Sequence, residues 1–267
     1  MNELNSVVTQ ILQVSPIMKI MRVKPVGWEF PAFKGGQFVA LALPGSAERN
    51  DTATDEFETP ADPDKLIKRA YSIASTSTAE YVEFYITLVH SGALTPRLFN
   101  LNIGDKVFMG KKGVGMFTLD SVAPEKNIVL IATGTGVAPY MSMLRSDALR
   151  RKGNIMVVHG AANSWDLGYS SELQLLESMF DQFTYLPTIT EPQKEPAGWS
   201  GDTRFIEKIW EGGIAKEKWG FDPKADDTEI FLCGNPRMIE SMVALLEKDG
   251  FKEHTKKEPG QIHVEEF

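Results

Sequence analysis

Short apolar runs separated by turn residues occupy the first 122 residues of the chain. Runs of this length and spacing are typical of an antiparallel barrel or sandwich. The predicted strands cover residues 7–14, 17–23, 37–43, 70–74, 82–89 and 106–109, with one short helix over residues 95–101. The sequence therefore predicts a small antiparallel β-barrel in this part of the chain.

From residue 123 the pattern changes, because apolar runs now alternate with stretches of helical spacing. The predicted strands cover residues 128–132, 155–160, 184–189 and 229–233, and the predicted helices cover residues 140–151, 171–180, 204–211 and 236–248. This alternation is the signature of a parallel, doubly wound sheet. We therefore predict two domains, a barrel over residues 1–122 and an α/β domain over residues 123–267.

Composition and charge limit the class of protein, its partners and its location in the cell. The 267 residues are 42% hydrophobic and 24% charged, as in ordinary globular proteins. A net charge of −8 argues against nucleic acid as a partner. No apolar stretch approaches transmembrane length, and MNELNSVVTQ lacks the features of a signal peptide. We expect a cytoplasmic protein that does not bind membranes.

Cysteine and histidine usage excludes several kinds of site. One cysteine allows no intramolecular disulfide and no cysteine-ligated iron–sulfur cluster within the chain. Four scattered histidines show no paired spacing that would suit zinc. We therefore expect no metal site.

The stretch IVLIATGTGVAPYMSMLR, residues 128–145, combines a buried strand, a glycine turn and a helix. Gly134 and Gly136 end the apolar run, and Pro139 suits the first turn of a helix. Backbone N–H groups and a helix dipole at such a turn suit a phosphate group. The pattern is GxGxxP and not the dinucleotide-binding GxGxxG, so an ordinary strand-to-helix turn stays open as the alternative.

The motif RAYSIAS, residues 69–75, lies at a predicted strand of the barrel half. Because alternate side chains of a strand share a face, Arg69, Tyr71 and Ile73 are expected to point together and Ser72 away from them. An arginine beside a tyrosine on an exposed face offers a phosphate clamp and an aromatic plate. An edge strand with an amphipathic face would have the same pattern.

A second turn, HSGALTPRL at residues 90–98, places Gly92 and Thr95 just before the expected short helix. Its N–H groups and hydroxyl suit a phosphate, although a plain capped helix has the same pattern. Two phosphate sites and an aromatic plate in one domain suit a flavin dinucleotide better than any one of them does. We therefore expect FAD, and not FMN, as the cofactor.

These flavin motifs resemble those of the ferredoxin–NADP+ reductase family, in particular its bacterial branch that depends on ferredoxin or flavodoxin. RAYSIAS is similar to the family's Arg-x-Tyr-Ser motif. This likeness implies that Arg69 binds the FAD pyrophosphate, Tyr71 stacks on the isoalloxazine and Ser72 lies near flavin N5. SGALTPRL is similar to the family's Gly-x-x-Ser/Thr segment, which assigns to the pyrophosphate Gly92, Leu94 and Thr95.

The resemblance extends to the second half of the chain. ATGTGVAPYMS is similar to the family's nicotinamide-nucleotide turn, and FLCGNPRMI, residues 231–239, to its Cys-Gly-x-x-x-Met segment. The second likeness implies that Cys233 and Gly234 lie beside the nicotinamide. Phe267 matches an aromatic that covers the other flavin face, although many members continue several residues past it. The turn residues assigned to the nucleotide are Thr133, Gly134, Thr135 and Gly136.

The resemblance implies an enzyme that exchanges a hydride with NADP(H), possibly NAD(H), and single electrons with ferredoxin or flavodoxin. Tyr71, Ser72, Cys233 and Phe267 become the candidate catalytic residues. Acidic partners of this kind are steered by a basic rim, for which the candidates are Lys111, Lys112 and Arg97. Ordinary solvated surface charges are the alternative for all three, and no motif requires a partner subunit, so we expect a monomer.

Two other functions fit the same two-domain plan. One is the NADH-dependent reductase component of an oxygenase, although its form with a fused iron–sulfur domain is excluded by the single cysteine. The other is a flavin- or nucleotide-binding module without turnover. Retention of Ser72 and Cys233 favours an enzyme over such a module.

The chain departs from its family where NADP(H)-specific members bind the 2′-phosphate with arginines. Ala162 in HGAAN and Glu191 in TITEP stand where the family has arginines, and Arg204 in GDTRF is the nearest match to a third. A carboxylate repels a phosphate but accepts a hydrogen bond from the ribose hydroxyl of NADH. We expect weak discrimination between NADH and NADPH, with the two kcat/KM values within about a hundredfold of each other. Alternatively Glu191 turns to solvent, and Lys194 or Arg204 supplies the positive charge that binds the 2′-phosphate of NADPH.

Overall fold

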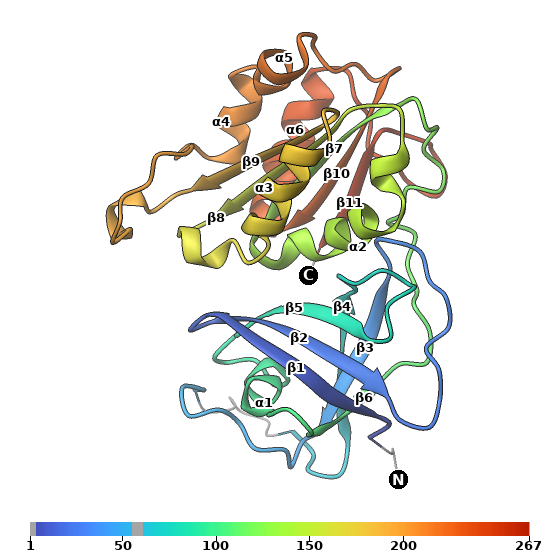
Figure 1. Cartoon of the computed structure of the whole chain (residues 1–267), viewed down its shortest axis with the longest axis vertical. Helices are drawn as coiled ribbons and strands as arrows, with labels where there is room; N and C mark the ends of the chain where they lie inside the picture. The colour runs from blue at the N-terminus through green and yellow to red at the C-terminus, as the bar shows by residue number, and fades with distance from the viewer. Residues whose placement is uncertain (1–3, 55–60, 267) are drawn as a thin grey trace. The chain divides into compact units, whose positions relative to one another are not determined.

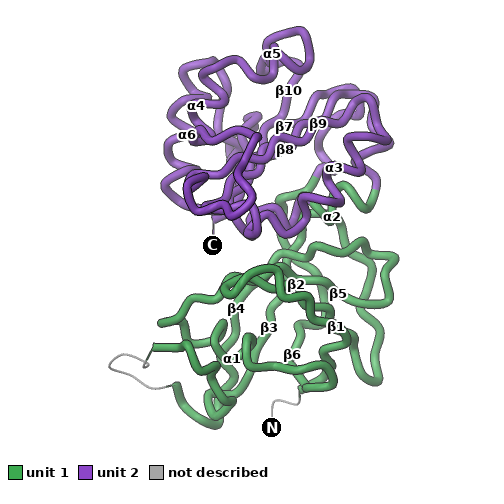
Figure 2. The backbone as a smooth tube through the Cα atoms, turned by 60° about the vertical axis from the view of Figure 1, so that its left-hand side comes forward, with its two compact units in different colours: residues 1–118, 141–146 green, residues 119–140, 147–267 purple. Residues whose placement is uncertain are grey.

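The computed structural model describes residues 4–54 and 61–266, so the flavin-covering candidate Phe267 lies outside the described residues. The chain divides into two compact units, coloured separately in Figure 2. Unit 1 comprises Met1–Thr118 and Met141–Ser146, and unit 2 comprises Leu119–Tyr140 and Asp147–Phe267. The domain boundary between residues 122 and 123 stays a prediction.

Unit 1 is built on a six-stranded antiparallel sheet in the order β4-β3-β6-β1-β2-β5 (Figure 1), which confirms the predicted antiparallel barrel architecture. The end strands meet again where Ala74 N donates to Glu83 O at 2.8 Å. The elements of unit 1 are β1 (Ser6–Ser15), β2 (Met18–Pro25), β3 (Phe38–Pro44), β4 (Leu66–Ser72), β5 (Val82–Thr87), α1 (Thr95–Asn100) and β6 (Lys106–Met109).

The alternation of strand β3 shows how the barrel forms its core. Val39, Leu41 and Leu43 point inward and are at most 2% exposed. They join an apolar cluster that includes Phe84 of β5 and Leu98 of α1. The apolar pattern therefore selects the face that each strand buries, as expected for a period of two.

A buried carboxylate ties the segment Met141–Ser146 into unit 1. The Glu83 side chain is 1% exposed and accepts from Arg22 Nε and from Arg145 Nη1, each at 2.6 Å. Ser142 Oγ also donates to Ser75 O at 2.7 Å. Because a buried charge is costly unless it is paired, the two arginines offset the cost of burying the Glu83 carboxylate.

Unit 2 contains a five-stranded sheet in the order β11-β10-β7-β8-β9, with every neighbouring pair parallel (Figure 1). This arrangement confirms the predicted α/β class. Its strands are β7 (Asn127–Thr133), β8 (Ile155–Ala161), β9 (Phe183–Ile189), β10 (Thr228–Gly234) and β11 (Ile262–Glu266). The helices are α2 (Ala138–Ser146), which runs from unit 2 into the segment assigned to unit 1, α3 (Ser170–Met179), α4 (Ile206–Glu211), α5 (Ile214–Trp219) and α6 (Pro236–Lys248).

Helices α4, α5 and α6 share one apolar cluster with the sheet. Alternate residues of the strands, such as Val129 and Leu232, meet Ile209 of α4 and Met242 of α6, all at most 2% exposed. The other sheet face is covered by α3, which packs on β9. Burial of both faces explains the nearly continuous apolar runs of β7 and β8.

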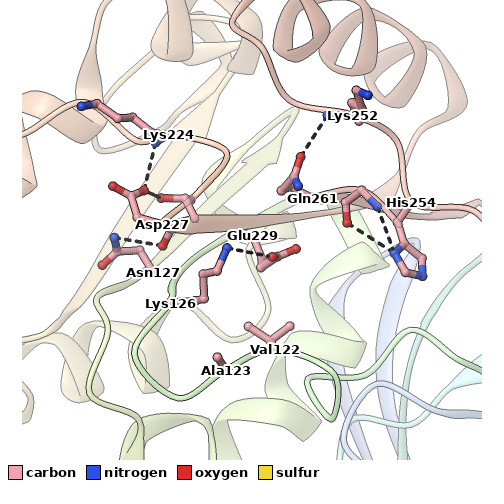
Figure 3. A network of polar contacts seen from close by, with 12 residues as sticks. Val122, Ala123, Lys126, Asn127, Lys224, Asp227, Glu229, Lys252, His254 and Gln261 are labelled. Atoms are coloured by element: carbon pink, nitrogen blue, oxygen red, sulfur yellow. Dashed lines mark hydrogen bonds and ion pairs between the residues drawn. The ribbon is translucent and has the colours of Figure 1, made fainter. Parts of the chain in front are cut away.

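Polar contacts hold together the amino ends of the parallel strands, as Figure 3 shows. Lys126 before β7 pairs with Glu229 of β10 at 3.5 Å, and Asn127 Nδ2 donates to Asp227 O at 3.4 Å. Asp227 Oδ1 in turn accepts from Lys224 N at 3.0 Å. These groups satisfy one another and stabilise the amino end of the sheet. Ligands of open α/β sheets bind at the opposite end, outside the carboxyl ends of the strands.

Element boundaries differ from the predictions at several places. Strand β4 begins at Leu66 and not at residue 70, and helix α2 ends at Ser146 and not at residue 151. Helix α5 and strand β11 were not predicted. Among residues 4–54 and 61–266, no helix has the length and apolarity needed to cross a membrane.

Candidate nucleotide and flavin sites

The order of strands in unit 2 creates a switch point between β7 and β10. From β7 the chain continues to β8 and β9 on one side, and β10 and β11 lie on the other side. Ligands of open α/β sheets bind outside the carboxyl ends of the strands at such a point. The residues found there are Thr133 and Gly134 from β7 and its turn, and Cys233 and Gly234 from β10.

The glycine turn closes tightly over the end of β10. Gly134 has a φ of +53°, and residues Gly134–Val137 form a single 3₁₀ turn before α2. A Cβ atom on Gly136 would collide with the carbonyl group of Cys233, and one on Gly234 would collide with Thr133 Oγ1. Only glycine fits at both positions, so the two chain segments approach backbone to backbone.

Side chains of unit 2 hold this arrangement in place. Thr133 Oγ1 accepts from Asn235 N at 2.7 Å, which joins the turn to the start of α6. The Tyr140 hydroxyl, fully buried, lies 2.9 Å from Ile131 O and 2.7 Å from Phe231 O. These bonds link the carboxyl halves of β7 and β10, so the protein's own side chains fix the backbone at the switch point.

His159 at the end of β8 also fixes the turn. Its ring is fully buried, and Nε2 lies 2.9 Å from Gly134 O. Burial lowers the pKa of His159 to about 4, against a smaller opposing effect of the Gly134 hydrogen bond. The ring is therefore neutral at pH 7, and because a carbonyl only accepts, Nε2 carries the proton. Nδ1 is buried without a partner in the described part of the chain.

The candidate nicotinamide residue Cys233 faces a carboxylate from the last strand. Its thiol is fully buried and donates to Glu265 Oε2 at 3.8 Å. Burial first, and then the Glu265 carboxylate, raise the pKa of Cys233 well above its ordinary value. The thiol therefore stays protonated at neutral pH, and it acts as a neutral group and not as a nucleophile.

In unit 1, strand β4 carries the residues assigned to the flavin. Arg69 is exposed, and its Nη1 donates to the neighbouring Lys68 O at 2.8 Å. Tyr71 is half-buried against the barrel core, 6.4 Å edge-on from Phe84, and burial raises its pKa. Its hydroxyl has no partner among the described residues. Ser72 ends the strand, half-buried, and Ile73 beyond it is fully buried, so the exposed face that was predicted to include Ile73 is shorter.

The second predicted phosphate turn is closed by its own threonine. Thr95 Oγ1 accepts from Val89 N at 3.0 Å and lies 3.2 Å from Val89 O. Gly92 N also donates to Val89 O, at 2.8 Å. Leu94 is 2% exposed, with its side chain in the barrel core. Only backbone atoms of Leu94 are therefore placed to meet a ligand, while the Thr95 hydroxyl shapes the turn.

One residue of the predicted basic rim is buried, and its assignment was wrong. Arg97 is 4% exposed, and its guanidinium donates to Ala93 O at 2.6 Å and Gly45 O at 2.7 Å. It therefore holds two loops of the barrel together and cannot steer a partner. Lys111 and Lys112 are exposed, as the rim prediction requires of them.

The positions compared with the 2′-phosphate arginines meet at the carboxyl edge of β8 and β9. Ala162 is exposed just after β8, and its carbonyl accepts from Glu191 N at 2.9 Å. Arg204 O accepts from Thr188 Oγ1 at 2.7 Å, which ties the third segment to β9. The structure thus brings together Ala162, Glu191 and Arg204, which are far apart in the sequence.

Sequence reasoning missed three residues of these sites. His159 was visible within HGAAN, but nothing in the sequence shows that it reaches Gly134. Glu265 lies on the unpredicted strand β11, and Asp202, which contacts Arg204, lies in a segment without periodic pattern. His159 and Glu265 are recognised only through contacts with residues distant in the chain. Asp202 is recognised through its contact with Arg204 in an irregular segment.

Known proteins share the nucleotide-binding domain and the two-domain fold of this chain. Residues 130–244 match the model of the oxidoreductase NAD-binding domain. Over 98% of this chain, the fold is similar to that of a ferredoxin NADP+ reductase from Neisseria gonorrhoeae with bound FAD and NADP. That match has a TM-score of 0.80 and 21% identity and covers 97% of that chain. The protein thus has the two-domain fold of that reductase.

Relatives with curated names specify the family. The chain is 30% identical over 241 residues to a flavodoxin/ferredoxin–NADP reductase of Buchnera aphidicola subsp. Schizaphis graminum, covering 90% of each chain. It is 31% identical over 205 residues to the protein of that name from Buchnera aphidicola subsp. Baizongia pistaciae, covering 76% of this chain and 81% of the relative. The chain belongs to the flavodoxin/ferredoxin–NADP reductase family, as the motifs predicted.

Proposed function

We propose that the protein is an FAD-dependent reductase that exchanges a hydride with a pyridine nucleotide and single electrons with a ferredoxin or flavodoxin. When bound, FAD supplies the chemistry, since it can take two electrons as a hydride and release them one at a time. The chain's own residues bind and orient the two nucleotides. The curated relatives named flavodoxin/ferredoxin–NADP reductase align with most of the chain.

The observation that carries the proposal is the glycine cradle at the switch point of unit 2. Gly136 packs directly on the Cys233 carbonyl because it has no Cβ, and Gly134 adopts a positive φ of +53°, so the turn closes tightly over the end of β10. Backbone N–H groups before a helix suit the pyrophosphate of a dinucleotide. Thr133 and Thr135 complete the proposed cradle with their hydroxyls.

Cys233 and Gly234 are proposed to hold the nicotinamide at the end of β10. The buried thiol is protonated and bonded to Glu265, so it supports the end of β10 without reacting with a bound ring. The ring would be positioned by the backbone of Cys233 and Gly234. Glu265 acts here as a positioning residue, because its carboxylate touches the thiol.

The barrel residues fit a flavin dinucleotide on two grounds. Arg69 is exposed and donates to the neighbouring Lys68 carbonyl, so its guanidinium can turn to a pyrophosphate. The Tyr71 hydroxyl is buried and unpartnered among the described residues, which is costly unless a ligand satisfies it. Ser72, Gly92, Leu94 and Thr95 complete the proposed flavin residues, together with Phe267.

The partner and setting are part of the same proposal. Lys111 and Lys112 are the remaining rim candidates for an acidic ferredoxin or flavodoxin. A monomer in the cytoplasm, without nucleic acid or membrane as partner, stays our expectation from composition. Pulldown and cross-linking at low ionic strength would test whether the two lysines contribute.

One set of measurements tests the function. The purified protein should be yellow, release FAD and not FMN on denaturation, and lose its flavin absorbance when NADH or NADPH is added without oxygen. Added flavodoxin or ferredoxin should then become reduced, at a rate that depends on its concentration. A colourless protein, or a flavin that neither nucleotide bleaches, would contradict the proposal and favour a binding module.

A further inference from the structure

The adenosine end of the proposed nucleotide site is built from three chain segments. Glu191 N donates to Ala162 O, and Thr188 forms a parallel bridge with Asp202. Ile189 N also donates to Asp202 O at 3.1 Å. These backbone bonds set the segments around residues 162, 191 and 202–204 side by side at the carboxyl edge of β8 and β9.

Arg204, the one arginine in these segments, is already engaged by Asp202. Arg204 Nε lies 3.0 Å from each Asp202 carboxylate oxygen, and Nη2 also donates to Oδ2. Oδ1 in addition accepts from Arg204 N at 2.8 Å. The arginine lowers the pKa of Asp202, so the carboxylate is ionised at neutral pH. A phosphate that approaches this guanidinium would meet the anion already paired with it, which lies two residues away in the chain.

Lys194, the second cation of these segments, is also paired. Its Nζ lies 2.8 Å from Glu191 Oε2 across the single turn Pro192–Lys194. The following Glu195 accepts from Ser164 N at 2.7 Å and from Ser164 Oγ at 2.6 Å. The donors that follow Ala162 are therefore occupied by a carboxylate of the chain itself.

The resulting charge is unfavourable for a phosphate. Residues 161–164, 190–195 and 202–204 contain three carboxylates, Glu191, Glu195 and Asp202, against two cations, Lys194 and Arg204, which leaves one net negative charge. A phosphate monoester carries about −1.5 to −2 charges at pH 7. A ribose hydroxyl is neutral and can donate to a carboxylate, as in other dinucleotide sites.

We propose that the protein takes NADH in preference to NADPH, and that Asp202 and Glu191 determine this preference. The inference rests on the proposed function and deepens it by naming the nucleotide. It also departs from the relatives, whose names contain NADP. Asp202 acts by occupying Arg204, and Glu191 acts by occupying Lys194 and by standing where the family has an arginine.

The test compares binding and turnover in the flavin-loaded protein. Calorimetric titration with AMP and with adenosine 2′,5′-bisphosphate reads the 2′ position without any redox step. We expect the wild-type protein to bind AMP more tightly, and kcat/KM to be higher for NADH than for NADPH by about tenfold, the effect of one charge-assisted contact.

Asp202→Asn is the most informative variant. It keeps Oδ1 as the acceptor for Arg204 N but removes the charge that occupies the guanidinium. We expect the ratio of the two dissociation constants to shift toward the 2′-phosphorylated ligand by about tenfold. Asp202→Glu keeps the charge and should keep most of the preference. Glu191→Arg should shift the ratio in the same direction by about tenfold or more.

A matched control separates a local effect from net charge. Glu125 pairs with Lys152 at 3.3 Å near the amino end of β7, so Glu125→Gln removes the same charge away from the site. It should leave the ratio unchanged. Preference for the 2′-phosphorylated ligand in the wild-type protein, or an unchanged ratio in well-folded Asp202→Asn, would overturn the inference. A flavin that neither nucleotide reduces would instead contradict the proposed function, while the binding ratio would still decide the preference.

Discussion

The two units present their candidate sites in opposite ways. In unit 2, protein atoms already fill the space around the turn, with Gly136 packed on Cys233 and Gly134 held by His159. In unit 1, the strand β4 exposes Arg69 and leaves the Tyr71 hydroxyl buried without a partner among the described residues. The candidate nucleotide site is therefore shaped by backbone, and the candidate flavin site by side chains.

This difference predicts how each site responds to change. A site formed by close backbone approach is damaged most by an added atom, because the packing cannot expand. A site formed by side chains is damaged most by a deleted group, and it gains stability when its ligand arrives. Substitutions of both kinds can test the comparison.

The largest effect is expected for Gly136→Ala in unit 2. The added methyl group would meet the Cys233 carbonyl, so we expect a loss of about 3 kcal/mol in the free energy of unfolding, with loss of nucleotide binding. Urea unfolding followed by tryptophan fluorescence measures it, because four of the five tryptophans belong to unit 2: Trp165, Trp199, Trp210 and Trp219.

Gly220→Ala is the matched control for that substitution. Gly220 has a φ of +81° and no atom within 4 Å of an added Cβ, so only backbone strain of about 1 kcal/mol is expected. Nucleotide binding should remain. Equal losses in the two variants would show that the turn is not tightly packed and would break the comparison.

The next effect concerns pH and His159. The pKa of His159 is about 4 in the folded protein and about 6.5 when unfolded, so the unfolded chain binds the extra proton between these values. The neutral ring's contribution is complete above pH 6.5 and is lost as the pH falls toward 4, by up to about 3 kcal/mol.

His159→Gln should therefore flatten the pH profile of unfolding. The free energy of unfolding of each protein is measured in urea at constant ionic strength. As the pH falls from 6.5 to 4, the wild-type protein should lose more of this free energy than the variant does. At pH 7.5 the variant should lose about 1 kcal/mol if the hydrogen bond to Gly134 O is weakened. Parallel profiles for the two proteins would mean that the ring titrates normally and does not rigidify the turn.

A deletion in unit 1 should act on the cofactor and not on the fold. Arg69→Ala removes the proposed charge-assisted contact to the pyrophosphate, so we expect FAD to bind about thirtyfold more weakly, or about 2 kcal/mol. Flavin fluorescence titration of the stripped protein measures the dissociation constant. Lys68→Ala is the control, since Lys68 is the adjacent cation and lies over the Phe108 ring, 4.8 Å from its centroid. Equal retention of FAD in Arg69→Ala would remove Arg69 from the site.

The smallest effect is expected at Tyr71. Tyr71→Phe deletes a buried hydroxyl without a partner in the described chain, so the flavin-free protein should become more stable by about 1 kcal/mol. The ring would keep its packing on Phe84 and the face that is proposed to stack on the isoalloxazine. Thermal unfolding with and without FAD measures both states. If the variant is less stable without FAD, the hydroxyl has a protein partner, and the contrast between the units weakens.

Several elements were predictable because their signal is local. The apolar runs of β6 and the helical spacing of α6 gave their bounds to the residue, at Lys106–Met109 and Pro236–Lys248. The glycine turn after β7 was recognised from residues 128–145 alone. Apolar periodicity and turn chemistry act over a few residues, so sequence is sufficient for them.

Other elements depend on partners that are distant in the chain. Strand β11 has the polar sequence IHVEE, and it is a strand because it pairs with β10 from Ile230 to Gly234. Helix α5 is only six residues long between Gly213 and Gly220, too short to show a period. Helix α2 ends at Ser146, and the chain turns back after it, where Lys152 N donates to Pro124 O at 3.0 Å.

By itself, the sequence determined the two-domain class and the reductase family, and it predicted which residues bind the nucleotides. Only the tertiary structure decided which charges are available at those residues. It showed that Arg97 is buried, that Arg204 is occupied by Asp202 and that Lys194 is occupied by Glu191. The reason is physical: residue type and spacing follow from covalent order, whereas the pairing of a charge depends on which groups the fold brings within a few ångströms.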